Sequence, residues 1–282
     1  MPTKSNYTQG YSAATVASHA ARTIHSDAAF LLPHIKPTDR ILDVGCGPGT
    51  ITAGLAGLVP QGSVFAIDIS DEVLALARSH LAGLDPPPAN VTLQQADLLA
   101  GLAFPDGAFD VVFASQLFPH LPSARMRRAA LAEMRRVLRP GGVLATRDAA
   151  ELHFYPRARN PDALLTRYGD RARAHGGDGD ESMLPFPGGD MPALYAEVGF
   201  DAAGDRVKPS AGMTVYAGRE QREWIAATSL AKLAPGDPYR DSWTAAGITD
   251  EEIEKVREAF KAWGEDPGAW YVAVQAEVLG WK

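Results

Sequence analysis

Three glycines at alternating positions are the residues of this sequence best suited to hold a ligand. Gly45, Gly47 and Gly49 follow an apolar segment that carries the acid Asp43. Because glycine has no Cβ, a turn that is rich in it exposes bare backbone, against which a ligand can lie. Thr50 is placed to cap a helix that begins at the end of the turn. The pattern predicts a strand, a ligand-binding turn and a helix in succession.

The spacing of the glycines narrows the kind of ligand. A P-loop closes on a lysine followed by serine or threonine, and residues 50–51 contain no lysine. A dinucleotide-binding turn has the spacing GxGxxG, whereas the third glycine of this chain comes one residue early. That difference is small, so a dinucleotide site and an S-adenosylmethionine site both stay open.

Polar residues follow the next three predicted strands. Asp68 ends the strand 63–68, where a carboxylate can accept hydrogen bonds from both hydroxyls of a ribose. Asp97 follows the strand 91–95 and is suited to accept from an adenine amino group. Ser115 and Gln116 follow the strand 109–114. Since the carboxyl ends of parallel strands meet at one edge of a sheet, we expect these residues to line a single site.

Five segments in this order resemble the class I S-adenosylmethionine-dependent methyltransferases: 43–49, 68, 96–97, 109–115 and 138–144. The resemblance covers about residues 40–148 and is greatest to the ubiquinone/menaquinone-biosynthesis C-methyltransferases and their small-molecule relatives. Segments 7–11, 18–19, 22–23 and 277–282 are similar to a narrower subgroup of secondary metabolism, which includes dithiol S-methyltransferases. The family implies a Rossmann-like, seven-stranded sheet whose last strand, near 270–281, runs antiparallel.

The resemblance also implies S-adenosylmethionine as the cofactor and a set of residues that contact it. The methionine end would lie over residues 45–49, Asp68 would bind the ribose, Ile69 would pack on the adenine, and Asp97 would bind the adenine amino group. The full set is Tyr11, Asp43, Gly45, Cys46, Gly47, Gly49, Thr50, Asp68, Ile69, Ala96, Asp97, Leu98, Ser115 and Gln116. The alternative for Asp68 and Asp97 is that they only cap the helices that follow them.

His120 is the side chain that we expect to act as a general base. It follows the fourth strand, close to where an acceptor would face the sulfonium, and an imidazole can remove a proton near neutral pH. The alternative is a histidine that packs or hydrogen-bonds within its loop. Tyr7, His19, Arg22 and Asp148 are expected to contact the substrate, the first three from an N-terminal segment that could close over the site.

Alternating strands and helices must position these residues. We expect helices at 12–31, 49–58, 71–82 and 123–138, and strands at 40–45, 63–68, 91–95, 109–114 and 143–147. Such β-α units predict an α/β fold with a doubly wound sheet, covered by helices on both faces. Beyond residue 148 we expect a variable insert at 153–190, a short helix at 191–198, a strand at 205–217, helices at about 219–233 and 249–263, and a strand at 270–281.

These elements predict four parts of the chain. Residues 1–39 form an N-terminal helical extension or lid, and residues 40–148 form the S-adenosylmethionine-binding core. Residues 149–268 contribute a helical substrate cap and late sheet elements, and residues 269–282 form a final strand of the core sheet.

Composition limits the partners. The net charge of −7 argues against a general affinity for nucleic acid, and the arginines between residues 125 and 139 are expected to be a solvated helix face. Cys46 is the sole cysteine and has no adjacent base, so we expect it to pack rather than react. His153 and His175 lack metal-ligand spacing, so no metal is expected. We also expect no membrane span and a cytoplasmic location.

The predicted function is methyl transfer from S-adenosylmethionine to a small-molecule thiol, hydroxyl or activated carbon by in-line displacement. A nucleotide-dependent oxidoreductase and a non-catalytic S-adenosylmethionine-binding protein are the alternatives. The acceptor and the oligomeric state stay open.

Overall fold

The computed structural model describes residues 19–121, 123–159, 161–175 and 186–282. In this part of the chain, one sheet has the strand order β3-β2-β1-β4-β5-β7-β6. The strands are β1 (Arg40–Val44), β2 (Ser63–Asp68), β3 (Val91–Gln95), β4 (Phe109–Ser115), β5 (Leu138–Tyr155), β6 (Val207–Tyr216) and β7 (Trp270–Trp281). Strands β1 to β5 are parallel, and β7 lies antiparallel between β5 and β6. The predicted α/β fold, with its antiparallel last strand, is confirmed.

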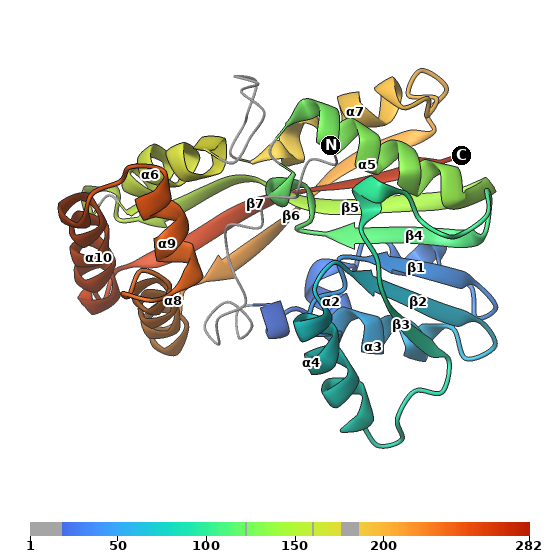
Figure 1. The fold of residues 1–282 in the computed structure, drawn as a ribbon, viewed down its shortest axis with the longest axis horizontal. Coiled ribbons are helices and arrows are strands. Elements are labelled where there is room, and N and C mark those ends of the chain that lie inside the picture. The colour runs from blue at the N-terminus through green and yellow to red at the C-terminus, as the bar shows by residue number, and fades with distance from the viewer. Residues whose placement is uncertain (1–18, 122, 160, 176–185) are drawn as a thin grey trace.

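Helices cover both faces of the parallel half of the sheet (Figure 1). Helices α3 (Thr50–Leu58) and α4 (Asp71–Ala82) lie on one face, and α5 (Ala124–Val137) and α7 (Met191–Glu197) lie on the other. The strands are therefore buried on both sides: Ile41 packs toward α3, whereas Leu42 packs toward α5. This burial explains why the neighbouring residues Ile41 and Leu42, which point to opposite faces, are both apolar.

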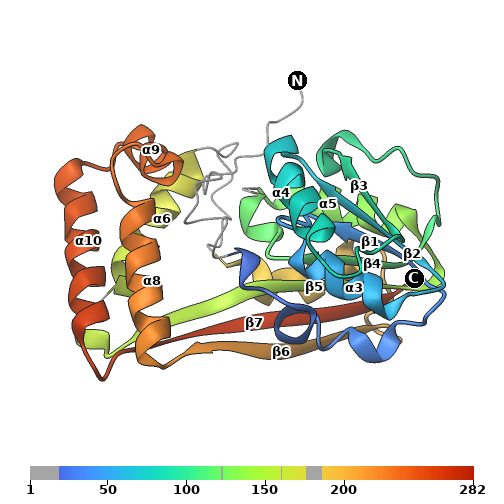
Figure 2. The ribbon, with the colours of Figure 1, turned by 90° about the horizontal axis from the view of Figure 1, so that it is seen from below.

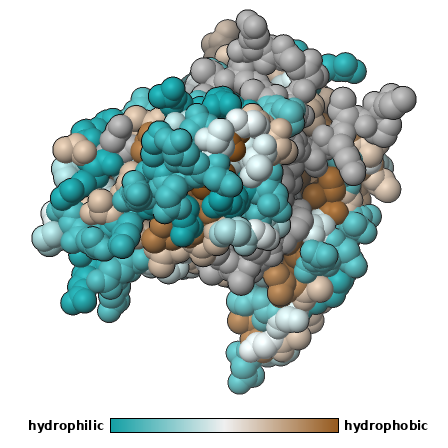
Figure 3. Space-filling model, turned by 60° about the vertical axis from the view of Figure 1, so that its left-hand side comes forward, coloured by the Kyte–Doolittle hydropathy of each residue, from teal (hydrophilic) through white to brown (hydrophobic). Residues whose placement is uncertain are grey.

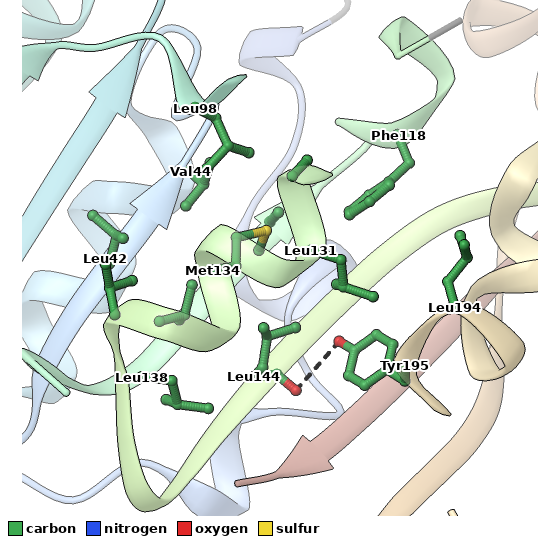
Figure 4. Close-up of a cluster of buried hydrophobic side chains, with 14 of the residues drawn as sticks. Leu42, Val44, Leu98, Phe118, Leu131, Met134, Leu138, Leu144, Leu194 and Tyr195 are labelled. Carbon is green, nitrogen blue, oxygen red and sulfur yellow. Dashed lines mark hydrogen bonds between the residues drawn. The ribbon is translucent and has the colours of Figure 1, made fainter. Parts of the chain in front are cut away.

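The larger apolar cluster joins α5 and α7 to the sheet (Figure 4). Leu131 and Met134 of α5 lie over Leu144 of β5 and are fully buried. Tyr195 of α7 is also fully buried, and its hydroxyl hydrogen donates to the oxygen of Thr146 at 3.2 Å or to the Leu144 carbonyl at 3.4 Å. A buried tyrosine needs such a partner, because an unpaired hydroxyl would lose its hydration without compensation.

Three long strands carry the chain from this core to a second group of helices (Figure 2). Strands β5 and β7 stay paired as far as Tyr155 and Trp270. Beyond them lie α6 (Pro161–His175), α8 (Arg219–Lys232), α9 (Pro238–Ala245) and α10 (Asp250–Glu265), which share an apolar cluster around Trp243 and Trp263. We call these four helices the helical lobe. Its outer surface in Figure 3 is mainly hydrophilic.

Short helical segments complete the described chain. They are α2 (Ile24–Asp27) and the 3-10 turns η1 (Leu32–His34), η2 (Leu98–Ala100), η3 (Phe118–His120), η4 (Arg157–Arg159) and η5 (Pro187–Asp190). No helix within the described ranges has both the length and the apolar character that crossing a bilayer requires.

The structure corrects several predicted elements. The helix expected at 12–31 is interrupted where it is described, because Thr23 caps the separate four-residue helix α2; residues 12–18 lie outside the described residues. The strand expected at 143–147 continues to Tyr155, and β5 therefore passes through the predicted boundary at 148/149. Helices α6 and α9 were not predicted, and α6 lies within the expected insert.

The arginines of α5 are not simply a solvated face. Arg127 is buried, and its Nε donates to the Leu121 carbonyl at 2.9 Å. Arg136 donates to the Leu102 and Phe104 carbonyls at 3.0 and 2.9 Å and pairs with Glu133 at 2.7 Å. These side chains attach loops to α5, which is a role that spacing along one helix does not reveal.

Candidate functional site

A cavity opens at the carboxyl ends of β1, β2 and β4, beside the glycine turn. The described residues around it include nearly all of the predicted cofactor set: Asp43, Gly45, Cys46, Gly47, Thr50, Asp68, Ile69, Ala96, Asp97, Leu98, Ser115 and Gln116. We call this the first cavity. Tyr11 lies outside the described residues.

The glycine turn is held by the neighbouring strand and leaves space on its cavity side. The amides of Gly45 and Cys46 donate to the Ile67 carbonyl at 2.8 and 3.0 Å, which attaches the turn to β2. Gly47 has a φ of +56°, and a Cβ added there would meet no atom within 4 Å. Gly49 does not line the cavity; a Cβ there would lie 3.1 Å from the Ala77 side chain, so this glycine brings α3 close to α4.

The N-terminus of α3 faces the same cavity. Its N-cap is Gly49, without a side-chain hydrogen bond, so Thr50 is the first helical residue and not the cap that we expected. Thr50 and Ile51 both line the cavity. A helix N-terminus carries a partial positive charge and unsatisfied backbone N–H groups, which favour an anionic ligand group such as a carboxylate.

A buried acid, Asp43, and a half-buried acid, Asp68, bracket the turn. Asp43 accepts a hydrogen bond from the Thr52 hydroxyl at 2.6 Å, and burial together with the charge of Asp68 raises the pKa of Asp43 to about 6. Asp68 accepts from the amides of Gly47 and Ser70 at 3.1 and 3.0 Å, while burial raises its pKa. A carboxylate has about four acceptor positions, so these backbone amides do not use all of the acceptor positions of Asp68.

Residues past β3 and β4 complete the wall. Asp97 accepts from the Leu99 amide at 2.9 Å and caps η2, so the capping alternative holds for this acid while it also lines the cavity. Ile69 exposes 40% of its surface at the cavity rim. The Ser115 hydroxyl is buried and lacks a hydrogen-bond partner among the described residues, although it faces the cavity. An orphaned buried hydroxyl of this kind is suited to a bound polar group.

Cys46 contributes packing instead of reactivity. The thiol is buried against Ala66 and Leu74. Burial and the charges of Asp43 and Asp68 raise its pKa, which keeps it in the unreactive thiol form.

A second, larger cavity lies between the core and the helical lobe. Its volume is about 720 Å³, within the range of small-molecule sites. Four residues line both cavities: His19, Arg22, Gln116 and His120. Gln116 has a φ of +55°, and its side-chain amide donates to Gln275 at 2.6 Å, so its orientation between the two cavities is set by β7.

His120 is the last residue of η3, at the point where the cavities meet. His19 approaches the same region from the N-terminal segment, and burial, Arg22, Lys232 and His120 lower its pKa to about 2, so it is neutral. Asp148 corrects our expectation: its buried carboxylate lines neither cavity and instead accepts from the Phe118 amide at 3.1 Å, beneath η3. Tyr7 lies outside the described residues.

Comparisons with known proteins identify the family. Residues 41–142 match the family described as "Methyltransferase domain". The chain is 46% identical over 281 residues to "Probable methyltransferase ltbC" of Aspergillus luteorubrus, covering 98% of this chain and 97% of that protein. It is 30% identical over 279 residues to an uncharacterized methyltransferase of Schizosaccharomyces pombe, C1B3.06c, covering 97% of this chain and 95% of that one. The chain belongs to the S-adenosylmethionine-dependent methyltransferases. This result sets the oxidoreductase alternative aside.

The fold of the methyltransferase agrees with solved structures. The YcgJ protein of Bacillus subtilis superposes with a TM-score of 0.55 at 18% identity, covering 92% of this chain and 98% of that one. The methyl donor is S-adenosylmethionine, and the first cavity fits it on two observations. These are the open space beside Gly47 and the unpartnered Ser115 hydroxyl. Within the described ranges, no group of three or more His, Cys, Asp or Glu residues is arranged to hold a metal ion.

Sequence reasoning missed most of the second cavity of the methyltransferase. Its walls include Asp27, Arg147, Lys232 and Gln275, from four separate segments. The sequence held one weak signal for this cavity. Arg147 lies on the predicted strand 143–147, and Gln275 lies on the predicted strand 270–281, which the family places antiparallel in the same sheet. The pairing of β5 with β7 brings them to one site, and no local pattern specifies that pairing.

Proposed function

We propose that the methyltransferase transfers a methyl group from S-adenosylmethionine in the first cavity to a small-molecule acceptor in the second. The observation that carries this proposal is the shared border of His19, Arg22, Gln116 and His120. A donor and an acceptor in adjoining cavities can meet only at that border. Aligning two reactants in this way can contribute roughly 7–11 kcal/mol to lowering the barrier.

The residues of the first cavity would orient the donor. We propose that the N-terminus of α3 and the turn at 45–49 hold its methionine end, that Asp68 holds the ribose hydroxyls, and that Ile69 and Asp97 hold the adenine. When bound, S-adenosylmethionine supplies a methyl group already activated by a sulfonium. The protein then has to position the acceptor and exclude water, and we propose that the half-buried side chains at the border of the two cavities do so.

His120 is the residue that we propose as the proton acceptor. It lies where the acceptor atom would be, and a neutral imidazole can take the proton that a hydroxyl or thiol loses on methylation. A thiol, a hydroxyl and an activated carbon all remain within the proposal, as does membership of the ubiquinone/menaquinone-like branch. We further propose that residues 149–268 act as the acceptor cap, since the helical lobe forms one side of the second cavity.

Calorimetry with S-adenosylhomocysteine in metal-free buffer tests the donor site. We expect binding to the wild-type protein, and Asp68→Asn should weaken it by about tenfold or more, because a charged acceptor is lost from the ribose site. Asp71→Asn is the matched control, since Asp71 is exposed on α4 and lies outside the cavity. Absence of binding in folded wild-type protein would contradict the proposal.

Turnover is tested with a panel of thiols, phenols and quinols, with S-adenosylhomocysteine formation as the readout. Product with at least one class supports methyl transfer to a small molecule. Binding of S-adenosylhomocysteine without turnover of any class would contradict the catalytic part of the proposal.

A further inference from the structure

Gln116 is held in one orientation where the two cavities meet. Its φ of +55° lies in the left-handed region, which residues with a side chain seldom adopt. The Gln116 backbone amide donates to the Arg147 carbonyl at 2.7 Å, and its side-chain nitrogen donates to the Gln275 oxygen at 2.6 Å. Strained backbone persists where its surroundings determine it, and such residues gather at ligand-binding sites. Gln116 lines both cavities, so a ligand at their border would meet it.

Gln275 presents a buried amide to the second cavity. It exposes 6% of its surface, and it lines the second cavity but not the first. Its partners on the neighbouring strands are Ala149 of β5 and Gly212 of β6. Both partners are small, so neither strand places a long side chain directly opposite Gln275. Tyr271 lies four residues before it on the same face of β7 and lines the same cavity, so this face of the strand is directed toward the cavity.

The two glutamine amides leave hydrogen-bonding groups unused. Each amide has one carbonyl oxygen and one NH2 group, and their mutual hydrogen bond uses the Gln116 nitrogen and the Gln275 oxygen. The Gln116 oxygen and the Gln275 NH2 group make no hydrogen bond with the described residues. Turning both amides over would exchange donor and acceptor and keep the same balance. Because a buried polar group without a partner costs free energy, this pair is suited to bind a ligand.

A single hydroxyl group can satisfy both unused groups. One amide carbon separates each of them from the shared hydrogen bond, which keeps both near the same point of the cavity wall. A hydroxyl has one hydrogen to donate and lone pairs that accept, so it can donate to the Gln116 oxygen and accept from the Gln275 NH2 group. A carboxylate or an ether has no hydrogen to donate and would leave the Gln116 oxygen unpaired. The pair therefore favours a hydroxyl.

The rest of the second cavity favours a flat, apolar ligand body. The rings of Tyr216 and Tyr271 stack nearly parallel, with an interplanar angle of 19°. Aromatic walls of this kind favour contact with another ring system. The apolar and aromatic residues among those that line the cavity include Leu152, Phe154, Leu165, Tyr216, Trp224, Phe260 and Tyr271.

We infer that the acceptor is an aromatic molecule with a hydroxyl next to its methyl-accepting atom, and that Gln116 and Gln275 bind this hydroxyl, which is not itself methylated. This inference rests on the proposed function, because it names the substrate class of that same site. Since Gln116 borders both cavities, a hydroxyl bound to it lies at the border, and the neighbouring atom of the ligand can face the donor. A methyl group in place of the hydroxyl would leave two polar groups of the protein unpaired.

The test compares two uncharged ligands of the same shape. Binding of 2,3-dihydroxynaphthalene and of 3-methyl-2-naphthol, in which a methyl group replaces one hydroxyl, is measured by calorimetry at pH 7 with the protein saturated by S-adenosylhomocysteine. We expect the diol to bind at least tenfold more tightly. Equal affinities, or preference for the methyl compound, would overturn the inference. Failure of S-adenosylhomocysteine itself to bind would instead count against the proposed function.

Variants assign the preference to the glutamine pair. Gln275→Met keeps the length of the side chain and removes the amide, so it should reduce the preference for the diol to less than threefold. Its affinities for 3-methyl-2-naphthol and S-adenosylhomocysteine should change less than threefold, and the second of these shows that the variant is folded. Gln275→Leu should give the same result.

Gln94→Met is the matched control, because Gln94 also lies on a strand, β3, and is outside both cavities. It should keep the full preference for the diol. A preference that survives both Gln275 substitutions would overturn the assignment of the hydroxyl to Gln116 and Gln275.

Discussion

Single residues at this site support the fold and also line the cavity in which we propose that the donor binds. Asp68 ties the glycine turn to the end of β2 through the Gly47 amide, and it keeps acceptor positions toward the cavity. Asp97 likewise caps η2 while lining the cavity. Capping and ligand binding, which the sequence analysis treats as alternatives, are therefore compatible for these two acids. An acid at a strand end can do both because its oxygens accept several hydrogen bonds.

His120 gives the sharpest prediction for one residue. His120→Gln keeps a side chain that can hydrogen-bond but cannot accept a full proton near neutral pH. If the imidazole is the base, kcat for a phenol or thiol acceptor should fall about a hundredfold or more, whereas KM for S-adenosylmethionine should change less than about threefold. Steady-state kinetics over a pH series measures both.

The control for that prediction is His80→Gln, at the C-terminal end of α4 and outside both cavities. It should leave kcat and KM at their wild-type values. Unchanged turnover in His120→Gln would show that His120 only supports its loop.

Local elements were predicted well where each follows from its own residues. Helix α4 begins after Ser70, whose hydroxyl accepts from the Val73 amide, and it spans the expected 71–82. Elements that depend on distant partners were not predicted. Strand β5 continues past its expected end because β7 pairs with it as far as Trp270. Helix α6 has a mainly polar sequence, and only Tyr168 and Ala172 of its described side chains are buried in the apolar cluster of the helical lobe. The first cavity follows from adjacent strand ends, whereas the second depends on this long-range pairing.

The turn η3 is attached to the sheet by a hydrogen bond from the Phe118 amide to the Asp148 carboxylate. Ionisation of this carboxylate should make the stability of the fold depend on pH. Burial raises the pKa of Asp148 to about 7, from an ordinary value near 3.8. The folded state then holds a proton that the unfolded state releases, so the contribution of Asp148 to stability is present below about pH 4 and is lost as pH rises toward and through 7. Asp148→Asn keeps an acceptor for the Phe118 amide and removes the ionisation.

Thermal unfolding from pH 5 to pH 8 checks this effect. The midpoint of Asp148→Asn relative to wild type should rise steadily from pH 5 to about pH 7 and level off above pH 7, because the folded and unfolded states differ in bound protons only between the two pKa values. Asp110→Asn provides a comparison, since Asp110 lies half-buried on β4, outside η3. A constant difference between Asp148→Asn and wild type over this range would contradict the raised pKa.

At the scale of the whole molecule, one buried ion network joins the segments that enclose the second cavity. Arg147 of β5 contacts Asp27 of α2, Glu277 of β7 and Thr214 of β6, and both Arg147 and Asp27 are buried. The sheet that connects the core to the helical lobe is thereby attached to the N-terminal segment that borders both cavities. Loss of one carboxylate would leave the buried guanidinium partly uncompensated.

Asp27→Ala should therefore lower the free energy of unfolding by about 3–5 kcal/mol, as measured by urea denaturation. Asp71→Ala removes an ion pair with Arg78 that is exposed on both sides, and it should cost about 1 kcal/mol or less. The comparison separates burial from charge, because each substitution deletes an aspartate paired with an arginine. If Asp27→Ala costs no more than Asp71→Ala, the network does not hold the N-terminal segment to the sheet, and the enclosure of the second cavity must depend on apolar packing alone.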